Sequence, residues 1–353
     1  MSDVASSVRV STEVPEPTLT CLMSRLDSVG IVEHARQGRP TGEFGHCTDD
    51  AGRALGLAAQ LATDPDCGTL AQACLRQIGA SLRPDGVFNV RLDARGIPTP
   101  EDPSDDATAR ALWGLAHVAN GVFGVAMQRE AERLLAATAG FQSLHPRAAA
   151  HAVLAGAVLI GNSPSSQGGL RLLHDNVPHL MRPGRSGSWL WPEPRLAYSN
   201  GLLCEALLAA GHAQFDDGRV DEGLRLLHWL ADVERSPAGH FSFTPVGGRG
   251  PGDGPGFDQQ PIEAWAMASA CRTAADLTHD PGWTEPLVMA AAWFGGANDL
   301  GVLMWNRETG ASYDGLTAAG PNRNEGTEST IALIGTMLAL GPRGYAARRR
   351  ESR

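Results

Sequence analysis

The sequence predicts an all-α protein, an (α/α)6 toroid in which six helical hairpins close into a ring. Twelve Ala- and Leu-rich segments carry apolar residues at helical spacing and are separated by loops rich in Gly and Pro. These segments repeat at a nearly constant offset, and the connections between them alternate between long and short. A closed ring of inner and outer helices explains all three observations with a single domain.

The two sets of helices differ in composition. Six segments mix Arg, Glu and Gln with an apolar stripe, which is typical of helices with one solvated face. The other six are richer in Ala and Gly, and small side chains allow the close helix approach that an inner ring needs. We expect outer helices to begin near Leu19, Cys67, Val122, Gly168, Val220 and Trp283, and inner helices near Thr48, Ser104, Pro146, Tyr198, Gln260 and Asn324.

The repeat has a measurable register. Aligning Arg53 with Arg110 places Asp49 on Asp106, an offset of 57 residues from 49 to 106. Aligning Glu205 with Glu263 gives an offset of 58 residues. Two separate alignments therefore agree on the length of one repeated unit.

The ends of the chain differ from this pattern. We expect a flexible segment over residues 1–17, the toroid over 18–343 and a basic tail over 344–353. Residues 1–17 contain no apolar core of a signal peptide, and no later stretch has about 18 uninterrupted apolar residues. The sequence thus indicates a cytoplasmic protein that does not enter a membrane.

Charge and cysteine usage exclude several classes of function. The formal net charge of -10 argues against a protein that binds nucleic acid through phosphates. The six cysteines show no CxxC spacing and are interpreted as buried free thiols. No HExxH or comparable spacing predicts a metal site, and no cofactor is expected.

Long loops are expected to form one rim of the ring. The longest connections run from an outer helix to the next inner helix, and in an alternating ring they all lie at the same end. They hold aromatic residues that would make this rim a wall for a ligand. The loops are 84–103, 183–197, 239–257 and 301–323, with Phe88, Trp189, Trp191, Phe241, Phe243, Trp305 and Tyr313.

Acidic residues gather where the inner helices begin. They are Asp49, Asp50, Asp105, Asp106, Asp258, Glu263, Glu325 and Glu328. A structural interpretation stands beside a functional one, because acids in a first turn complement the helix dipole and Asp49–Arg53 and Asp106–Arg110 have the spacing of i,i+4 ion pairs. Capping alone, however, does not require aromatic neighbours or long loops.

Carbohydrate binding uses both features. Amides that hydrogen-bond to hydroxyl groups are available at Asn200, Gln259, Gln260, Asn322 and Asn324. The stretch from Trp189 through Trp191 to Glu193 would present two indole rings beside a carboxylate. The alternative for these tryptophans is a hydrophobic plug beneath a loop.

Several stretches together resemble one bacterial group. They are CTDDAGRAL from Cys47, WPE from Trp191 with YSN from Tyr198, FDQQPIEA from Phe257, and DGL from Asp314 followed by NRNEGTEST from Asn322. This group, the six-hairpin-glycosidase-like proteins, is frequently labelled as glycosyltransferases. The resemblance implies a toroid that acts on carbohydrate, with Asp314, Glu325 and Glu328 among its site residues. The family pattern favours Asn and Asp where this chain has Ala51 and Ser199.

The leading functional hypothesis is hydrolysis of an oligosaccharide or polysaccharide by paired carboxylates. The second and fifth inner helices face each other in a six-unit ring, which predicts Asp258 as general acid and Asp106 as base in an inverting reaction. Phe257 and Trp265 would raise the pKa of Asp258, and Arg110 would keep Asp106 ionised. Glu193 or Glu325 is an alternative partner.

Two other functions remain open at this point. Sugar epimerisation needs two basic residues, for which only His46 and His240 are suitably placed in the sequence. A non-catalytic glycan-binding subunit that serves a glycosyltransferase is also compatible with Ala51 and Ser199.

Overall fold

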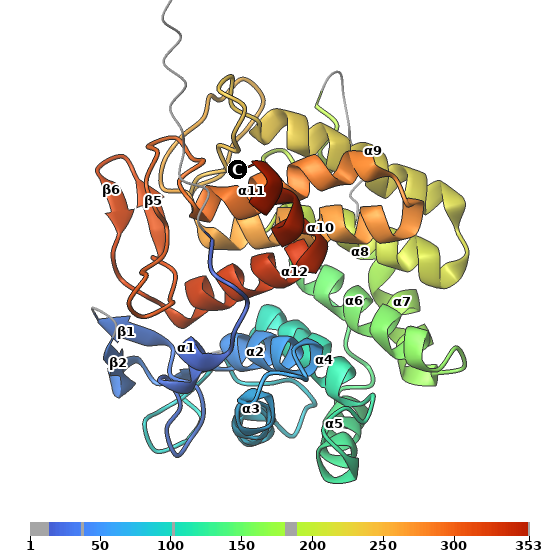
Figure 1. Ribbon diagram of the computed structural model, residues 1–353. Helices are drawn as coiled ribbons and strands as arrows, with labels where there is room; N and C mark the ends of the chain where they lie inside the picture. Colours follow the sequence, from blue (N-terminus) through green and yellow to red (C-terminus); the bar gives the residue numbers. More distant parts are fainter. Residues whose placement is uncertain (1–13, 37–38, 101–102, 181–188, 352–353) are drawn as a thin grey trace, which may run out of the picture.

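The computed structural model describes residues 14–36, 39–100, 103–180 and 189–351 and shows a closed ring of inner helices (Figure 1). Each inner helix contacts the next one along the chain, and the last contacts the first. The (α/α)6 toroid expected from the sequence is therefore confirmed. The inner helices are α2 (Thr48–Gln60), α4 (Asp105–Val118), α6 (Pro146–Asn162), α8 (Gly201–Gln214), α10 (Pro261–Thr278) and α12 (Thr327–Glu351).

The outer helices lie outside this ring and begin close to the expected positions. They are α3 (Cys67–Ser81), α5 (Val125–Ala137), α7 (Gln167–Asn176), α9 (Asp217–Glu234) and α11 (Thr284–Phe294). The first, α1 (Thr20–Met23), is a single turn. It ends early because the Asp27 carboxylate accepts the Val29 and Gly30 N–H groups in a tight turn that carries the chain towards the rim.

Glycines bring the inner helices together backbone to backbone. A Cβ atom on Gly52 of α2 would lie 2.6 Å from the Arg110 carbonyl of α4, and one on Gly201 of α8 would overlap the Ala266 carbonyl of α10. Only residues without a side chain fit at these crossings. The interpretation of small residues as inner-ring residues is thus correct.

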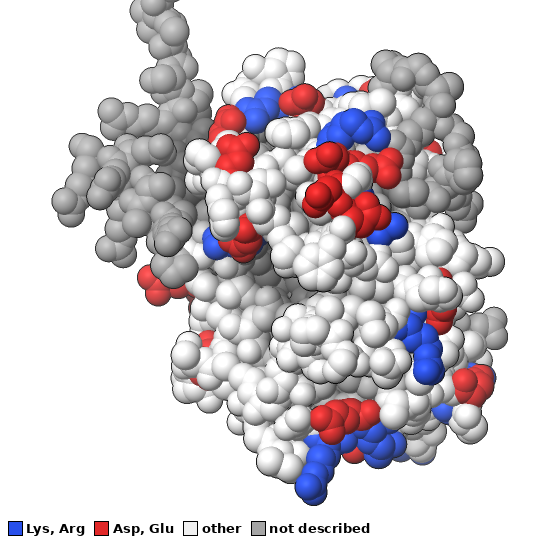
Figure 2. All heavy atoms as spheres, turned by 90° about the vertical axis from the view of Figure 1, so that its right-hand side faces the viewer, with Lys and Arg blue, Asp and Glu red and all other residues white. Residues whose placement is uncertain are grey.

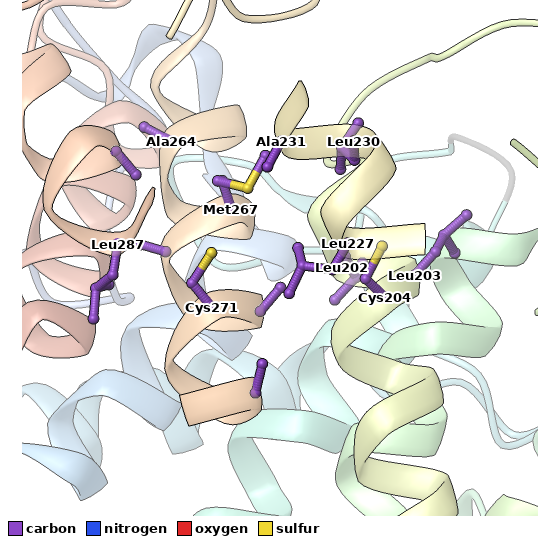
Figure 3. Close-up of a cluster of buried hydrophobic side chains, with 14 of the residues drawn as sticks. Leu202, Leu203, Cys204, Leu227, Leu230, Ala231, Ala264, Met267, Cys271 and Leu287 are labelled. Atoms are coloured by element: carbon purple, nitrogen blue, oxygen red, sulfur yellow. The ribbon is translucent and has the colours of Figure 1, made fainter. Parts of the chain in front are cut away.

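The main hydrophobic core fills the space between the inner and outer helices. Figure 3 shows Leu202 of α8 next to Leu227 of α9, and Met267 of α10 next to Ala231 of α9. The side of the molecule shown in Figure 2 carries small patches of both charge signs separated by uncharged surface. The outer helices therefore bury one face and solvate the other, as their composition predicts.

Short antiparallel hairpins and 3-10 turns complete the structure. Every strand lies in an outer-to-inner connection, and Figure 1 shows the β1–β2 and β5–β6 hairpins at the same edge of the ring. The pairs are β1 (His34–Arg36) with β2 (Arg39–Thr41), β3 (His46–Cys47) with β4 (Arg91–Leu92), and β5 (Gly315–Thr317) with β6 (Gly320–Asn322). The 3-10 helices are η1 (Gly42–Phe44), η2 (Val177–His179) and η3 (Pro281–Trp283).

The ends of the chain fall partly outside this description. Most of the expected flexible segment 1–17 lies outside the described residues. At the other end, Gly341 leaves helical geometry at φ 64°, so the ring helix stops there and a second helical segment runs to Glu351. In the part of the chain that is described, no helix has the length and apolar character needed to span a membrane.

Candidate active site

A polar pocket of about 400 Å³ opens on the rim where the inner helices begin. Its wall is formed by α2, α12, the β1–β2 and β5–β6 hairpins and the segment before α10. Seven residues expected from the sequence line it together: Asp49, Asp50, Asp258, Gln260, Asp314, Asn322 and Glu328. Sequence reasoning did not identify four others in the same wall: Glu33, His34, Arg53 and Arg91.

Arg53 is the central cation beneath this pocket. It is only 2% exposed and forms ion pairs with Asp50 at 2.6 Å and Glu328 at 2.8 Å. Arg110 of the neighbouring helix α4 pairs with Asp49. Three carboxylates from two helices therefore surround two guanidinium groups.

The ion pairs expected within single helices are not the ones that form. Arg53 binds Asp50 one turn before it rather than Asp49, and Arg110 reaches across to Asp49 rather than to Asp106. The close approach of α2 and α4 at Gly52 gives Arg110 this reach. The ion-pair partner of Arg110 is therefore set by the packing of α2 against α4 and not by the residue spacing within α4.

The pocket carboxyls differ in protonation because their surroundings differ. Burial raises the pKa of Asp50 to about 7, against the opposing effect of Arg53. Desolvation acts in the same direction on Glu328, but the charges of Arg53 and Arg110 outweigh it and leave the pKa of Glu328 below its usual range. Glu328 is therefore an ionised carboxylate at neutral pH, and its side chain remains 45% exposed.

Asp258 has no cationic partner among the described residues. One of its oxygens, Oδ1, is buried and accepts no hydrogen bond. Burial and then the negative charge of Asp314 raise the pKa of Asp258. Asp314 itself accepts hydrogen bonds from Asn324 and from the Gly326 N–H at 2.6 Å. The two acids thus differ in environment: Asp258 Oδ1 accepts no hydrogen bond, whereas the Asp314 carboxylate accepts two. Such a difference suits one acid to donate a proton and the other to remain a carboxylate.

Backbone pairing brings these two acids into one wall. Gln259 and Leu316 exchange N–H···O bonds of 3.0 and 2.8 Å, which ties the segment before α10 to strand β5. A Cβ atom on Gly315 would lie 2.5 Å from Asp258 Oδ1, and one on Gly326 would lie 2.6 Å from Asp314 Oδ1. Glycine at both positions therefore leaves room for the carboxylates.

Asp106, the expected catalytic base, does not line the pocket. Its Oδ2 accepts a hydrogen bond of 2.5 Å from the Tyr198 hydroxyl. The other oxygen, Oδ1, is buried without a partner. Asp105 beside it accepts a bond from Ser143, also at 2.5 Å. The register match between Asp49 and Asp106 thus does not extend to pocket lining.

A second group of expected site residues forms a buried network that holds the chain entering α8. Arg147 of α6 pairs with Glu193 at 2.5 Å and donates to Asn200 at 3.1 Å. Glu263 accepts hydrogen bonds from the backbone N–H groups of Ser199 and Asn200 and from the Asn200 side chain. Glu193, Asn200 and Glu263 therefore have polar partners inside the protein, and none of them lines the rim pocket.

Three further expected residues also have their polar groups occupied inside the protein. Gln259 is buried and donates to Asp299 at 2.5 Å. Glu325 accepts bonds from Asn306 at 2.7 Å and Thr309 at 2.9 Å, and Asn324 donates to Asp314. None of the three lines the rim pocket.

The expected aromatic wall is wrong for the large loop aromatics. Phe88, Trp191, Phe241, Phe243 and Trp305 are buried in the hydrophobic clusters, and Trp189 packs edge-on against Trp229 at 5.0 Å between ring centroids. The Trp189 and Trp191 indoles donate to Glu193, at its carbonyl and carboxylate. Burying the apolar surface of these rings stabilises the fold more than leaving it exposed on the rim. The alternative interpretation, a hydrophobic plug beneath a loop, therefore applies to these tryptophans.

Different aromatic rings are accessible in the connections that form the rim. Phe44, Tyr198 and Phe257 are 45%, 39% and 40% exposed. Phe44 contacts His34 edge-on at 4.8 Å, and Phe257 precedes Asp258. Sequence reasoning did not assign these three residues to sugar stacking, because hydrophobic character alone does not distinguish an exposed ring from a buried one.

The two histidines expected for epimerisation have other partners. His46 Nε2 lies 2.9 Å from Asp27, and His240 Nε2 lies 2.9 Å from Asp299. Neither lines the rim pocket, whereas His34 does. Within the described residues, no three His, Cys, Asp or Glu side chains come together in a metal-binding arrangement.

Buried carboxyls should make the protein less stable as the pH rises. Burial raises the pKa of Asp50 and of Glu205 of α8 to about 7 and that of Glu263 to about 8. Between about pH 4.5 and pH 8 the folded protein then binds more protons than the unfolded chain, so the free energy of unfolding falls with pH. Urea unfolding should show a higher midpoint at pH 5 than at pH 8.

Glu205→Gln removes one carboxyl that takes up a proton in this range, so the unfolding midpoint should fall less steeply with pH. Glu132→Gln, on the exposed surface of α5, should leave the slope unchanged. A midpoint that rises steadily from pH 5 to pH 8 would show that these carboxyls are ionised in the folded protein.

No protein-family model matches the chain, and no curated protein matches it in sequence. Solved structures match it in fold. A cellobiose 2-epimerase from Bacillus thermoamylovorans aligns at a TM-score of 0.68 and 12% identity, over 91% of this chain and 95% of that one. A sugar epimerase from a ruminal bacterium aligns at 0.67 and 12%, over 91% and 94%.

A more distant likeness is to a family 76 glycoside hydrolase, an α-mannanase from Bacteroides thetaiotaomicron. It aligns at a TM-score of 0.57 and 11% identity, over 87% of this chain and 88% of that one. Likeness at such identities establishes the fold alone. The chain thus shares the (α/α)6 toroid of these proteins, which supports the resemblance to six-hairpin-glycosidase-like proteins at the level of fold.

Proposed function

We propose that the rim pocket is the active site of an enzyme that hydrolyses a glycan. The observation that carries this proposal is the pairing of Asp258, a partly buried acid without a cationic partner among the described residues, with Glu328, an ionised carboxylate held by Arg53 in the same pocket. Glycosidic cleavage needs one carboxyl that gives a proton and one that is ionised. The names of the similar solved structures, which include epimerases and a mannanase, fit a sugar-processing role.

Asp258 is the general acid in this proposal. Burial and the charge of Asp314 raise its pKa, which favours the protonated form that can give a proton to the oxygen of the leaving sugar. Asp314 reinforces this by its negative charge, since ionising both acids together is unfavourable. Gln260 and Asn322 in the same wall are available to hydrogen-bond to sugar hydroxyls.

Glu328 is the base that the pocket supports best. It lines the pocket, half exposed, and Arg53 keeps it ionised so that it can take a proton from an attacking water. Asp106, the base expected from the sequence, is the competing candidate through its contact with the Tyr198 hydroxyl near the rim. Glu328→Gln and Asp106→Asn assayed side by side decide which one is needed.

A glycan panel tests the reaction itself. The purified protein is incubated with oligosaccharides and polysaccharides, and release of new reducing ends is compared with exchange of hydrogen at sugar C2. Hydrolysis predicts reducing ends without C2 exchange. C2 exchange without cleavage would replace hydrolysis by epimerisation with His34 as the pocket histidine, and binding without turnover would favour an accessory subunit of a glycosyltransferase.

A further inference from the structure

A second and larger cavity, of about 640 Å³, lies at the end of the ring opposite the rim pocket. All six inner helices contribute to it with residues of their middle and last turns, among them Leu57, His117, Leu154, Glu205, Arg272 and Leu338. A chamber of about 40 Å³ separates the two cavities. That chamber touches Arg53 on the rim side and Trp113, Trp265 and Glu205 on the other side.

Two tryptophans form the inner end of this second cavity. Trp113 of α4 and Trp265 of α10 meet edge to face across the ring, with 6.1 Å between ring centroids. Each ring packs on a glycine of a neighbouring inner helix: a Cβ atom on Gly56 of α2 would overlap Trp113, and one on Gly335 of α12 would overlap Trp265. The rings are thus fixed in place by two matching Trp–Gly contacts.

Glu205 supplies the only carboxyl in the lining of this cavity, among the described residues. Its one hydrogen bond comes from Thr273 Oγ1 at 3.5 Å, and no described cation pairs with it. Arg272 in the same wall is engaged by Asp276 at 3.0 Å. The chain contains no lysine, and among the described residues no arginine other than Arg272 lines this cavity.

We propose that this second cavity binds a small organic cation, an ammonium group on an apolar body, with Glu205 as its counter-ion and the Trp113 and Trp265 rings as its cation–π partners. A bound ammonium group would pair with the Glu205 carboxylate, which has no cationic partner among the described residues, and would offset the cost of burying its charge. The π-face of an indole ring attracts such a group through its negative potential. Leu57, Leu154 and Leu338 offer apolar surface for the rest of the ligand.

Choline and its neutral isostere 3,3-dimethylbutan-1-ol provide the probe pair, titrated calorimetrically into the full chain at pH 8. Choline should bind at one site, and the alcohol should bind at least about tenfold more weakly, since it has the same shape but no charge. Glu205→Gln should weaken choline binding at least about tenfold, while Glu132→Gln on the outer surface should not change it. Glu205→Gln should fold, because it removes a buried charge without changing volume.

The wild-type protein also gives a test that needs no variant. Choline affinity should fall from pH 8 to pH 6 as Glu205 takes up its proton, because burial raises the pKa of that carboxyl to about 7. The two histidines that line this cavity and the chamber, His117 and His151, do not titrate in this range. Burial lowers the pKa of His117 to about 4 and that of His151 well below its usual range, and Arg272 stays paired with Asp276.

Equal binding of choline and the alcohol, unchanged binding by Glu205→Gln, or preferential binding of cellobiose in this cavity would each overturn the proposal. Asp258→Asn separates the two sites. It should strongly lower glycan turnover at the rim and leave choline affinity unchanged, so failure of the proposed hydrolysis does not affect this result.

Discussion

Replacing Asp258 by Asn should lower glycan turnover by about 10²–10⁴-fold, the range typical of a lost general acid. The amide keeps the shape of the side chain but has no acidic proton to give to the leaving oxygen. Because Asp258 makes no ion pair in the described structure, the melting temperature should stay within about 2 °C of the wild type. Initial rates of reducing-end release, with melting curves from the same preparations, provide the measurement.

Glu33→Gln is a suitable control for this variant, since Glu33 lines the same pocket and pairs with Arg91. Its effect on turnover should be much smaller than that of Asp258→Asn. Full activity in Asp258→Asn would remove Asp258 from the reaction.

Replacing Arg53 by Met should destabilise the protein by about 3–5 kcal/mol, the usual cost of leaving a buried charge without its partner. Arg53 and Asp50 are 2% and 3% exposed, so solvent does not compensate the lost cation. Methionine retains the aliphatic part of the side chain, so the loss reports on charge more than on packing. Urea unfolding at pH 7 gives the free energy directly.

Two further variants calibrate this result. Asp50→Asn combined with Arg53→Met should recover part of the loss, because both buried charges are then gone. Arg133→Met breaks an exposed pair with Glu130 on α5 and should cost less than about 1 kcal/mol. A loss below about 1 kcal/mol in Arg53→Met would show that the ion pair between Arg53 of α2 and Glu328 of α12 does not hold these two helices together at the rim.

The fold was predictable because its signals are local. Helical periodicity and Gly- and Pro-rich loops are properties of neighbouring residues, and the repeat offset of 57 residues from Asp49 to Asp106 can be read by aligning the sequence with itself. The same pattern placed acids where the inner helices begin. It predicted correctly that Asp49, Asp50, Asp258 and Glu328 lie close together, since all four line one pocket.

The parts that were not predicted depend on contacts between distant segments. Arg110 chooses Asp49 on another helix because glycine brings the two backbones together, and no spacing within α4 reveals this. Trp191 is buried because α9 supplies a stacking partner in Trp229. Its position in a loop therefore led to a wrong prediction of exposure, because tertiary packing decides whether such a residue is buried.

Hydrogen exchange of Asp258→Asn with and without a glycan ligand tests the central claim, that glycan occupies the rim pocket, most directly. Bound glycan should slow exchange of backbone amides around Asp49–Arg53, Asp258–Gln260 and Asp314–Asn322, the segments that line the rim pocket. Slowed exchange only around Glu205 and Arg272, at the opposite end of the ring, would contradict the account.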